Sequence, residues 1–338
     1  MGERIFGKTP RGKLTHLYSL ENAYFRITMS DYGATLVSLV DKKTGIDLVL
    51  GYNSVEGYLK TCPYMGATVG RVCNRIGKGM FKLNDKTYHL MTNDRGNTLH
   101  GGLVGFASKI WIPEINENSL IFTLESPDGD EGFPGKLKVK AKYELAEDKL
   151  IFTWSGISDQ DTLLSLTNHA YFNLEGPRSL SVLDQELKIN SEEIVEVDNN
   201  GLALEKTYEV KDTPFDFRKY KKIGTDLNKE DPQLKNGQGY DHHFVISRSG
   251  LREAARLKGN GIELIVSTDL PGLQLYSANF LEGNSLGKEG GTFPKHSAIC
   301  LETQYVPNAI NYEKYEKPIL LKGKEMIHQT IYQVAHYE

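Results

Sequence analysis

The chain of 338 residues is long enough to bury a large core, either as two domains or as one large β domain. Its net charge of −4 and its pI of about 6.2 give no electrostatic reason to expect nucleic acid or an anionic membrane as a partner. The mean hydropathy is −0.42, and no apolar stretch approaches the roughly 18 to 20 residues of a membrane-spanning helix. The first twelve residues lack the apolar segment of a secretory signal, so we expect a cytoplasmic protein.

Three cysteines, Cys62, Cys73 and Cys300, lie far apart in the chain. No Cys-x-x-Cys spacing occurs, so neither a disulfide framework nor a structural zinc site is expected, which suits a reducing cytosol. We expect inert, partly buried thiols. Cys73 lies within a candidate functional segment described below, which makes it a candidate for modification.

Short alternating segments, typical of half-buried strands, follow one another along the chain. Ser54 is expected to cap one short helical turn that runs to Leu59, and no long helical stripe appears. The sequence Gly259-Asn260-Gly261 predicts a type I′ turn between two strands. Strands are predicted at residues 25–29, 36–40, 48–50, 120–124, 136–145, 150–154, 256–257 and 262–266.

The clearest alternation covers residues 136–145, where apolar residues occupy every odd position and charges nearly every even one. This pattern predicts a strand with one wet and one dry face. Its lysine stripe would also suit a polyanion site, but we favour a solvated sheet face that discourages edge pairing.

Many short strands and 33 glycines favour an all-β fold, a sandwich or a barrel. Because no linker, low-complexity tract or clear repeat is present, we expect a single domain over residues 1–338.

Sequence motifs for nucleotide cofactors and for metals are absent. There is no Gly-x-Gly-x-x-Gly after a strand, no phosphate-binding loop, no Gly-x-Ser-x-Gly and no His-Glu-x-x-His. His242 and His243 are adjacent, so on a strand they would point to opposite faces and would not chelate one ion. We therefore expect no cofactor and no metal.

Several polar residues lie in glycine-rich or apolar surroundings and are candidates for a functional site. Residues 66–76 contain Arg71, Asn74 and Arg75 among small and apolar residues, and arginine can donate two parallel hydrogen bonds to one ligand group. His100 precedes Gly101 and Gly102, which permit close backbone approach. Taken alone, the arginines are equally compatible with a structural role, and a histidine in a surface turn is the commoner reading of His100.

Four further positions are candidates for acid–base or binding roles. If residues 167–173 form a strand, His169 shares one face with Thr167, Tyr171 and Asn173, as a pocket lining would. Asp241 precedes a strand-like run, and a carboxylate can hold two neighbouring sugar hydroxyls. Glu302 follows an apolar run, and burial there would raise the pKa of its carboxyl group, as suits a general base. Gln274 lies in a run of residues that favour a strand, and taken alone this position does not indicate a function. Each position also has a structural alternative. Asp241 would be an ordinary turn residue, His169 a hydrogen-bonded core histidine, and Glu302 the end of a strand that reaches solvent.

Eight short segments, in the same order, resemble the galactose mutarotase (aldose 1-epimerase) family over nearly the whole chain. The segments are residues 70–76, 98–102, 128–135, 168–174, 213–217, 240–242, 271–274 and 301–304.

The resemblance implies a large twisted antiparallel β-sandwich, the mutarotase supersandwich, with an open sugar cleft and a free monosaccharide as substrate. It implies that Glu302 is the general base and His169 the general acid of a cofactor-free isomerase. A monomer or weak homodimer is expected. Cys73 replaces a small residue such as alanine, which does not affect the chemistry. Sugar contacts are implied for Asn74, Arg75, His100, Asp241 and Gln274.

Two alternatives remain open. A hexose-6-phosphate 1-epimerase would need a cationic phosphate pocket, to which Arg71 would contribute, and the neutral-sugar motifs argue against it. A non-catalytic sugar-binding module on the same fold is disfavoured by the presence of both Glu302 and His169. The sequence does not rank galactose against glucose, xylose or arabinose.

Overall fold

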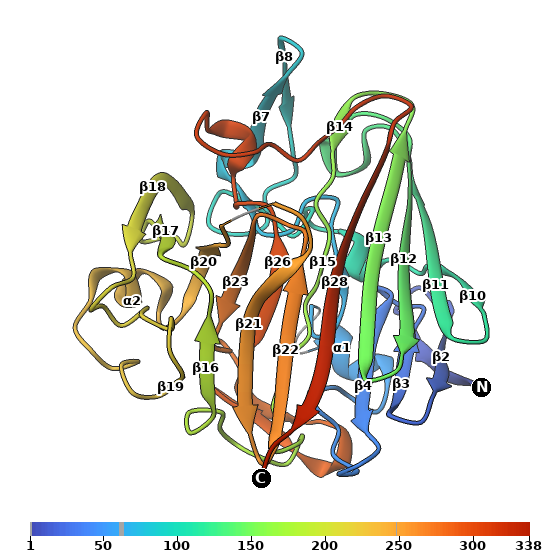
Figure 1. The fold of residues 1–338 in the computed structure, drawn as a ribbon. Coiled ribbons are helices and arrows are strands. Elements are labelled where there is room, and N and C mark those ends of the chain that lie inside the picture. The colour runs from blue at the N-terminus through green and yellow to red at the C-terminus, as the bar shows by residue number, and fades with distance from the viewer. Residues whose placement is uncertain (1, 61–63, 248) are drawn as a thin grey trace.

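The structure is a computed structural model that describes residues 2–60, 64–247 and 249–338, and antiparallel sheets dominate it (Figure 1). The largest has nine strands in the order β10 (Ile112–Ile115), β11 (Ser119–Ser126), β12 (Leu137–Ala146), β13 (Lys149–Ser158), β28 (Glu325–His336), β22 (Ile262–Thr268), β21 (Arg252–Gly259), β16 (Glu186–Ile189) and β19 (Lys221–Lys222). A five-stranded sheet has the order β18 (Ala203–Glu209), β17 (Glu193–Val197), β20 (Asp241–Val245), β23 (Gly272–Tyr276) and β26 (Cys300–Gln304).

The N-terminal segment forms a four-stranded sheet. The remaining ladders of the described chain are separate two-stranded sheets. The four strands are β1 (Gly2–Lys8), β2 (Leu14–Glu21), β3 (Phe25–Ser30) and β4 (Thr35–Asp41). The two-stranded pairs are β14 (Thr162–Leu163) with β27 (Ile319–Leu320), β15 (Thr167–Asn168) with β5 (Thr68–Val69), β24 (Glu282–Leu286) with β25 (Thr292–Pro294), β6 (Arg75–Ile76) with β9 (Thr98–Leu99), and β7 (Met80–Leu83) with β8 (Lys86–His89).

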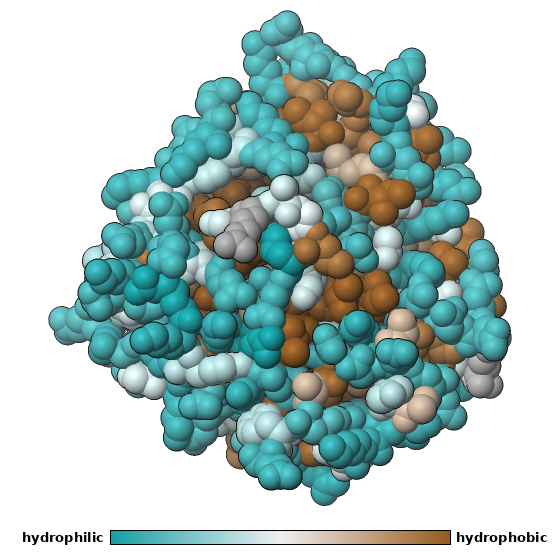
Figure 2. All heavy atoms as spheres, viewed as in Figure 1, coloured by the Kyte–Doolittle hydropathy of each residue, from teal (hydrophilic) through white to brown (hydrophobic). Residues whose placement is uncertain are grey.

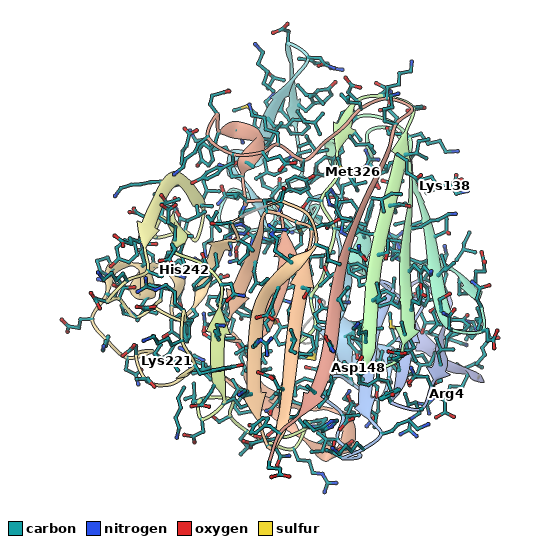
Figure 3. The ribbon with its side chains drawn as sticks, in the orientation of Figure 1. Arg4, Lys138, Asp148, Lys221, His242 and Met326 are labelled. Carbon is teal, nitrogen blue, oxygen red and sulfur yellow. The ribbon has the colours of Figure 1, made fainter. Side chains whose placement is uncertain are left out.

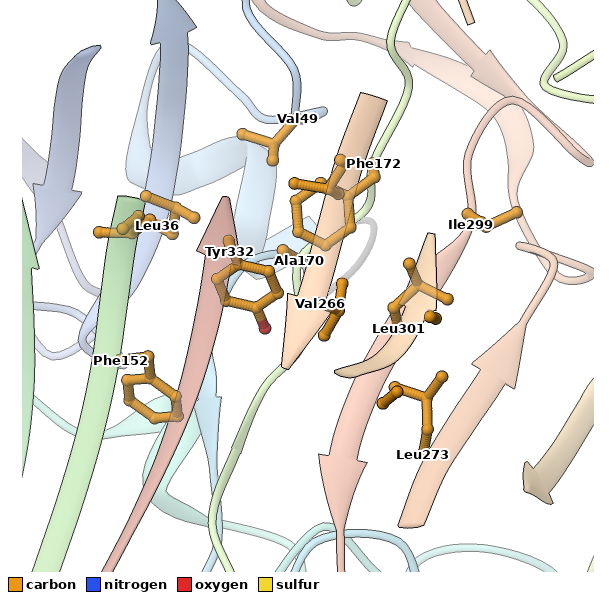
Figure 4. Close-up of a cluster of buried hydrophobic side chains, with 14 of the residues drawn as sticks. Leu36, Val49, Phe152, Ala170, Phe172, Val266, Leu273, Ile299, Leu301 and Tyr332 are labelled. Carbon is orange, nitrogen blue, oxygen red and sulfur yellow. The ribbon is translucent and has the colours of Figure 1, made fainter. Parts of the chain in front are cut away.

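The main core packs the nine-stranded sheet against the five-stranded sheet and the four-stranded sheet (Figure 4). Phe152 and Tyr332 come from the large sheet, and Leu273 and Leu301 come from the smaller one, all with at most 1% of their surface exposed. Because side chains alternate along a strand, the opposite face of β20, β23 and β26 carries the polar residues Asp241, Gln274 and Glu302. One sheet thus supplies a wall of the core and a wall of the candidate site.

Most predicted strands are confirmed. Residues 25–29, 36–40, 120–124, 136–145 and 150–154 lie in or overlap β3, β4, β11, β12 and β13. Strands β21 and β22 form the predicted hairpin, in which Asn260 and Gly261 both have the positive φ angles, 51° and 72°, that a type I′ turn requires. Burial alternates strictly along the first half of β12, as the charge pattern predicts.

Two strand predictions are wrong in extent. Residues 48–50 form no strand of the described structure, because Val49 makes only an isolated bridge to Phe172. Only Thr167 and Asn168 of the predicted strand at residues 167–173 belong to a ladder, β15. The rest of that segment stays extended, and its backbone groups bond to several different neighbouring segments rather than to one partner strand.

The described chain contains two short α-helices, α1 (Val55–Lys60) and α2 (Pro232–Gly237). The first follows Ser54 as predicted. The second was not predicted, although Asp231 accepts hydrogen bonds from the backbone N–H groups of Gln233 and Leu234, and Pro232 occupies the first turn. Neither helix has the length and apolar character that crossing a membrane requires.

The lysine stripe of β12 lies on the solvent-facing side of the large sheet. Lys138 points away from the sheet into solvent (Figure 3). Lys136 pairs with Glu125 at 3.0 Å, and Lys142 pairs with Glu144. Figure 2 shows a mostly hydrophilic face with scattered apolar residues. These features match a solvated sheet face.

Candidate active site

Six of the seven predicted site residues line one cavity of about 240 Å³ beside the five-stranded sheet. The seventh, Gln274, is buried next to it and bonds to Asp241. Aromatic residues complete the walls: Tyr64, Tyr171, Tyr276 and the half-exposed Phe280. A larger groove, of about 770 Å³, lies beside α2 and contains none of the predicted site residues.

Strand register places the acidic residues on one face of the sheet, with β23 between their strands. In the five-stranded sheet, Gln274 on β23 lies directly opposite Glu302 on β26, and Asp241 on β20 lies opposite Tyr276. Residues paired in this way share one face of a sheet. Glu302 is 2% exposed, so the predicted burial of this carboxyl group is confirmed.

His169 projects from the extended segment that follows β15. The backbone N–H of His169 donates to Ala67, and its carbonyl accepts from Gly66, which fixes the segment against the neighbouring chain. The imidazole lies between two nearly parallel tyrosine rings, Tyr171 at 5.1 Å and Tyr64 at 6.2 Å between centroids. The Nε2 atom of the ring lies 3.7 Å from Oε1 of Glu302.

His100 occupies a tight turn that the two following glycines make possible. His100 itself has a positive φ of 50°, and Gly101 has a φ of 86°. A Cβ atom on Gly101 would lie 1.9 Å from the carbonyl oxygen of Gly70. The turn is therefore specific for glycine. It buries the His100 ring, of which Nδ1 accepts a hydrogen bond from the backbone N–H of Asn74 at 3.2 Å.

Arg75 is the cation of the cavity, and two carboxylates already contact it. Its Nε lies 2.7 Å from Asp94, and one Nη lies 3.9 Å from Asp241. Burial alone would lower the pKa of the guanidinium, but the two carboxylates outweigh it and raise that pKa. The Gln274 amide donates to the other Asp241 oxygen at 2.7 Å.

Burial is the main cause of the pKa shifts of Glu302 and His169. It raises the pKa of Glu302 well above its ordinary value, and the negative charge of Asp241 adds to this effect while Arg75 opposes it. Burial also lowers the pKa of His169 to about 4 and that of His100 well below its ordinary value. Both shifts favour the uncharged form of each group, because burial penalises charge.

The donor set of His100, His169 and Glu302, whose side-chain atoms lie within 4.8 Å of one another, is also one that zinc can use. Because Nδ1 of His100 accepts a backbone hydrogen bond, the neutral ring carries its proton on Nε2. A nitrogen that carries a proton cannot bind a metal ion. This geometry suits a hydroxyl-rich ligand better than a cation.

Two other candidates from the same segment have structural surroundings. Arg71 is 2% exposed and donates to the carbonyl oxygens of Ser126, Pro127 and Pro134, so it has the structural role considered above. Burial raises the pKa of the Cys73 thiol to about 12, which opposes its modification. Cys300 is likewise buried, and Cys62 lies outside the described residues.

Sequence reasoning missed several residues of the site. Asp94, which pairs with Arg75, lies in an Asn-Asp-Arg-Gly turn, where aspartate is common for other reasons. Tyr64 and Tyr276, whose rings contact that of His169, gave no signal in the sequence. Tyr171 belonged to the predicted pocket-lining row but received no role of its own.

Comparison with known proteins identifies relatives over almost the entire chain. The family model described as Aldose 1-epimerase matches residues 16–333. Human galactose mutarotase is 39% identical over 333 residues, and the aldose 1-epimerase of Escherichia coli is 34% identical over 337; each alignment covers 96% of both chains.

Solved structures agree with this match. The galactose 1-epimerase of Lactobacillus acidophilus is 31% identical, with a TM-score of 0.87 over 100% of this chain and 99% of its own. An aldose epimerase homologue from C. elegans is 28% identical, with a TM-score of 0.86 over 96% and 100%. The predicted all-β sandwich, the carbohydrate isomerase class and the aldose 1-epimerase function are confirmed. The chain belongs to the aldose 1-epimerase family.

Proposed function

We propose that this enzyme interconverts the α and β anomers of free aldohexoses such as galactose and glucose, with Glu302 as general base and His169 as general acid. The observation that most strongly supports this proposal is the buried contact of 3.7 Å between these two side chains, in a small cavity with Arg75, Asp241 and His100. The relatives named galactose mutarotase and aldose 1-epimerase support the choice of substrate.

The reaction needs one group that accepts a proton and one that donates it. Glu302 takes the proton from the C1 hydroxyl, while protonated His169 delivers its proton to the ring oxygen, so the C1–O5 bond breaks and the aldehyde forms. Rotation about C1–C2 presents the other carbonyl face to the C5 hydroxyl. On reclosure His169 recovers the proton from O5 and Glu302 returns its own to O1, so no net proton is gained or lost.

The sugar must bring the pair into this charged form. Without the sugar, burial favours an uncharged pair with the proton on Glu302. Hydrogen bonds from sugar hydroxyls to the carboxylate, together with the charge of Arg75, favour ionised Glu302 and leave the proton on His169. The remaining residues, Asn74, His100, Asp241 and Gln274, are proposed to bind and orient the sugar.

The 6-phosphate alternative receives little support from the cavity. Among the described lining residues Arg75 is the one lysine or arginine, and Asp94 and Asp241 already contact it. Asp241 also adds negative charge to the same walls. A phosphate dianion would therefore meet more repulsion than attraction.

The decisive variant is Glu302→Gln, which preserves shape and removes the base. We expect the enzymatic rate to fall by about 10² to 10⁴-fold, the usual contribution of a positioned acid–base group. Polarimetry of freshly dissolved α-galactose or α-glucose measures the rate of mutarotation. Calorimetric titration of the variant should still detect sugar binding. Glu125→Gln, on the exposed face of β11, is the matched control.

An active Glu302→Gln enzyme would refute the assignment of Glu302. Acceleration only with glucose 6-phosphate would favour the phosphate-specific alternative. Sugar binding by the wild-type protein without any acceleration would favour a binding module.

We further propose a cytoplasmic monomer or weak homodimer that acts as a single domain over residues 1–338. Sedimentation velocity across a concentration series tests the assembly state, and one cooperative transition in urea would support the single domain. A stable larger oligomer or two separate transitions would contradict these proposals.

A further inference from the structure

The site-facing side of the five-stranded sheet continues past the cavity as a buried polar layer. His243 on β20 lies directly opposite Gln274, and Gln304 on β26 lies opposite Gly272. His243 is 1% exposed, Gln304 is 0% exposed, and neither lines the cavity. Apolar side chains would ordinarily occupy such positions, so the polar groups require an explanation.

Gly272 makes room for the imidazole of His243. A Cβ atom at Gly272 would lie 2.0 Å from Nε2 of His243 and 2.4 Å from its Cε1. The ring therefore lies over Gly272. Gln274 is two residues further along the same strand, and Gln304 lies opposite Gly272 on the next strand. Any larger residue at position 272 would displace the ring from this place.

The layer contains several polar atoms without a protein partner. They are both ring nitrogens of His243, both side-chain polar atoms of Gln304 and the carbonyl oxygen of Gln274. Burying such atoms unpaired is unfavourable, so native proteins satisfy them by mutual contacts or with enclosed waters. Burial lowers the pKa of His243 to about 3, so the ring is neutral and offers one donor and one acceptor.

The Gln274 amide links this layer to the sugar site. Its Nε2 donates to Asp241 at 2.7 Å, which fixes the amide and leaves the carbonyl oxygen buried. If nothing holds that oxygen, the amide can rotate and release Asp241. A donor on the neighbouring strand would prevent this rotation, as outer hydrogen bonds orient residues that contact a ligand.

We propose that His243 and Gln304 are positioning residues: the His243 N–H holds the Gln274 carbonyl through one enclosed water, and the Gln304 amide reaches the other ring nitrogen through a second. Gln274 then holds Asp241 ready for the sugar. This inference rests on the proposed function, because Asp241 and Gln274 are taken as sugar-binding residues.

His242 provides a matched control for the test. It is the adjacent residue, it is 0% exposed, and its ring packs on the opposite side of the sheet against Phe215 at 4.6 Å. His243→Leu and His242→Leu remove similar volumes and similar buried polar groups. Only the first removes the support for Gln274, whereas the second removes an acceptor for the backbone N–H of Asp241.

Polarimetry with α-galactose should show that His243→Leu raises KM about tenfold and leaves kcat within about twofold, as expected for loss of an oriented binding contact. Gln304→Met should raise KM in the same way, whereas His242→Leu should retain the wild-type KM. In a Gln274→Met background the further effect of His243→Leu should vanish, because the two residues act as one unit. If His243→Leu does not fold, His243→Gln and Gln304→Met provide the same comparison.

Equal KM values for His243→Leu and His242→Leu, or an undiminished effect in the Gln274→Met background, would overturn the inference. A wild-type enzyme that fails to accelerate mutarotation would instead refute the proposed function. The same assay series therefore separates the two failures.

Discussion

Buried neutral histidines should make this protein sensitive to mild acid, and His242 is the clearest case. It is 0% exposed, and burial lowers its pKa to about 3. In the unfolded chain a histidine has a pKa of about 6.5. Between about pH 6.5 and pH 3 the unfolded chain therefore binds a proton at this position that the native state does not bind, and stability falls as the pH falls.

The magnitude follows from that difference. Between about pH 7 and pH 5.5, one such histidine removes about 1.2 kcal/mol from the free energy of unfolding. The pKa values of His100, His169 and His243 shift in the same direction, whereas those of Glu302 and Asp241 are raised and act in the opposite sense. In the wild type, the change of the free energy of unfolding with pH is therefore the sum of these opposing contributions. A variant that lacks one histidine isolates the contribution of that residue.

The variant is His242→Phe, which packs an aromatic ring of similar size against Phe215 and cannot titrate. Losing the Nδ1 acceptor for the backbone N–H of Asp241 lowers stability by a constant amount at every pH. Urea unfolding at about pH 7, 6.2 and 5.5 should show that the variant loses about 1.2 kcal/mol less than the wild type over this range. Identical pH dependence in both proteins would refute the reasoning.

Two further predictions concern the arginines. Arg71→Met should lower the free energy of unfolding by about 3 kcal/mol or more in urea, because several buried carbonyl oxygens lose their donor. Its folded fraction should retain the wild-type KM; a raised KM with unchanged stability would contradict the structural role. Arg75→Lys should lower kcat/KM at least about tenfold by polarimetry, since lysine cannot reproduce the planar fork between Asp94 and Asp241. A lysine variant with wild-type kcat/KM would contradict this.

The fold could be predicted where the alternation was strict. β12 and β13 have one dry face each, and the Asn260-Gly261 turn specifies its hairpin by backbone conformation alone. Prediction failed at residues 169–173, where apolar and polar residues alternate without a regular ladder. There, tertiary hydrogen bonds to several segments, rather than one partner strand, determine the conformation. Alternation reports which face is buried and carries no information on the bonding partner.

For the site, the residue types could be predicted, but not the distances between them. Glu302 and His169 lie on different segments that are distant in sequence, and only strand packing brings them to 3.7 Å. His243 is different, because the strand period of two places it on the same face as Asp241. The same argument places Gln304 on the face of Glu302. Once Asp241 and Glu302 are assigned to a sugar site, a polar residue two positions further along either strand is buried beyond that site. This spacing is a signal for supporting residues that single-residue motifs do not contain.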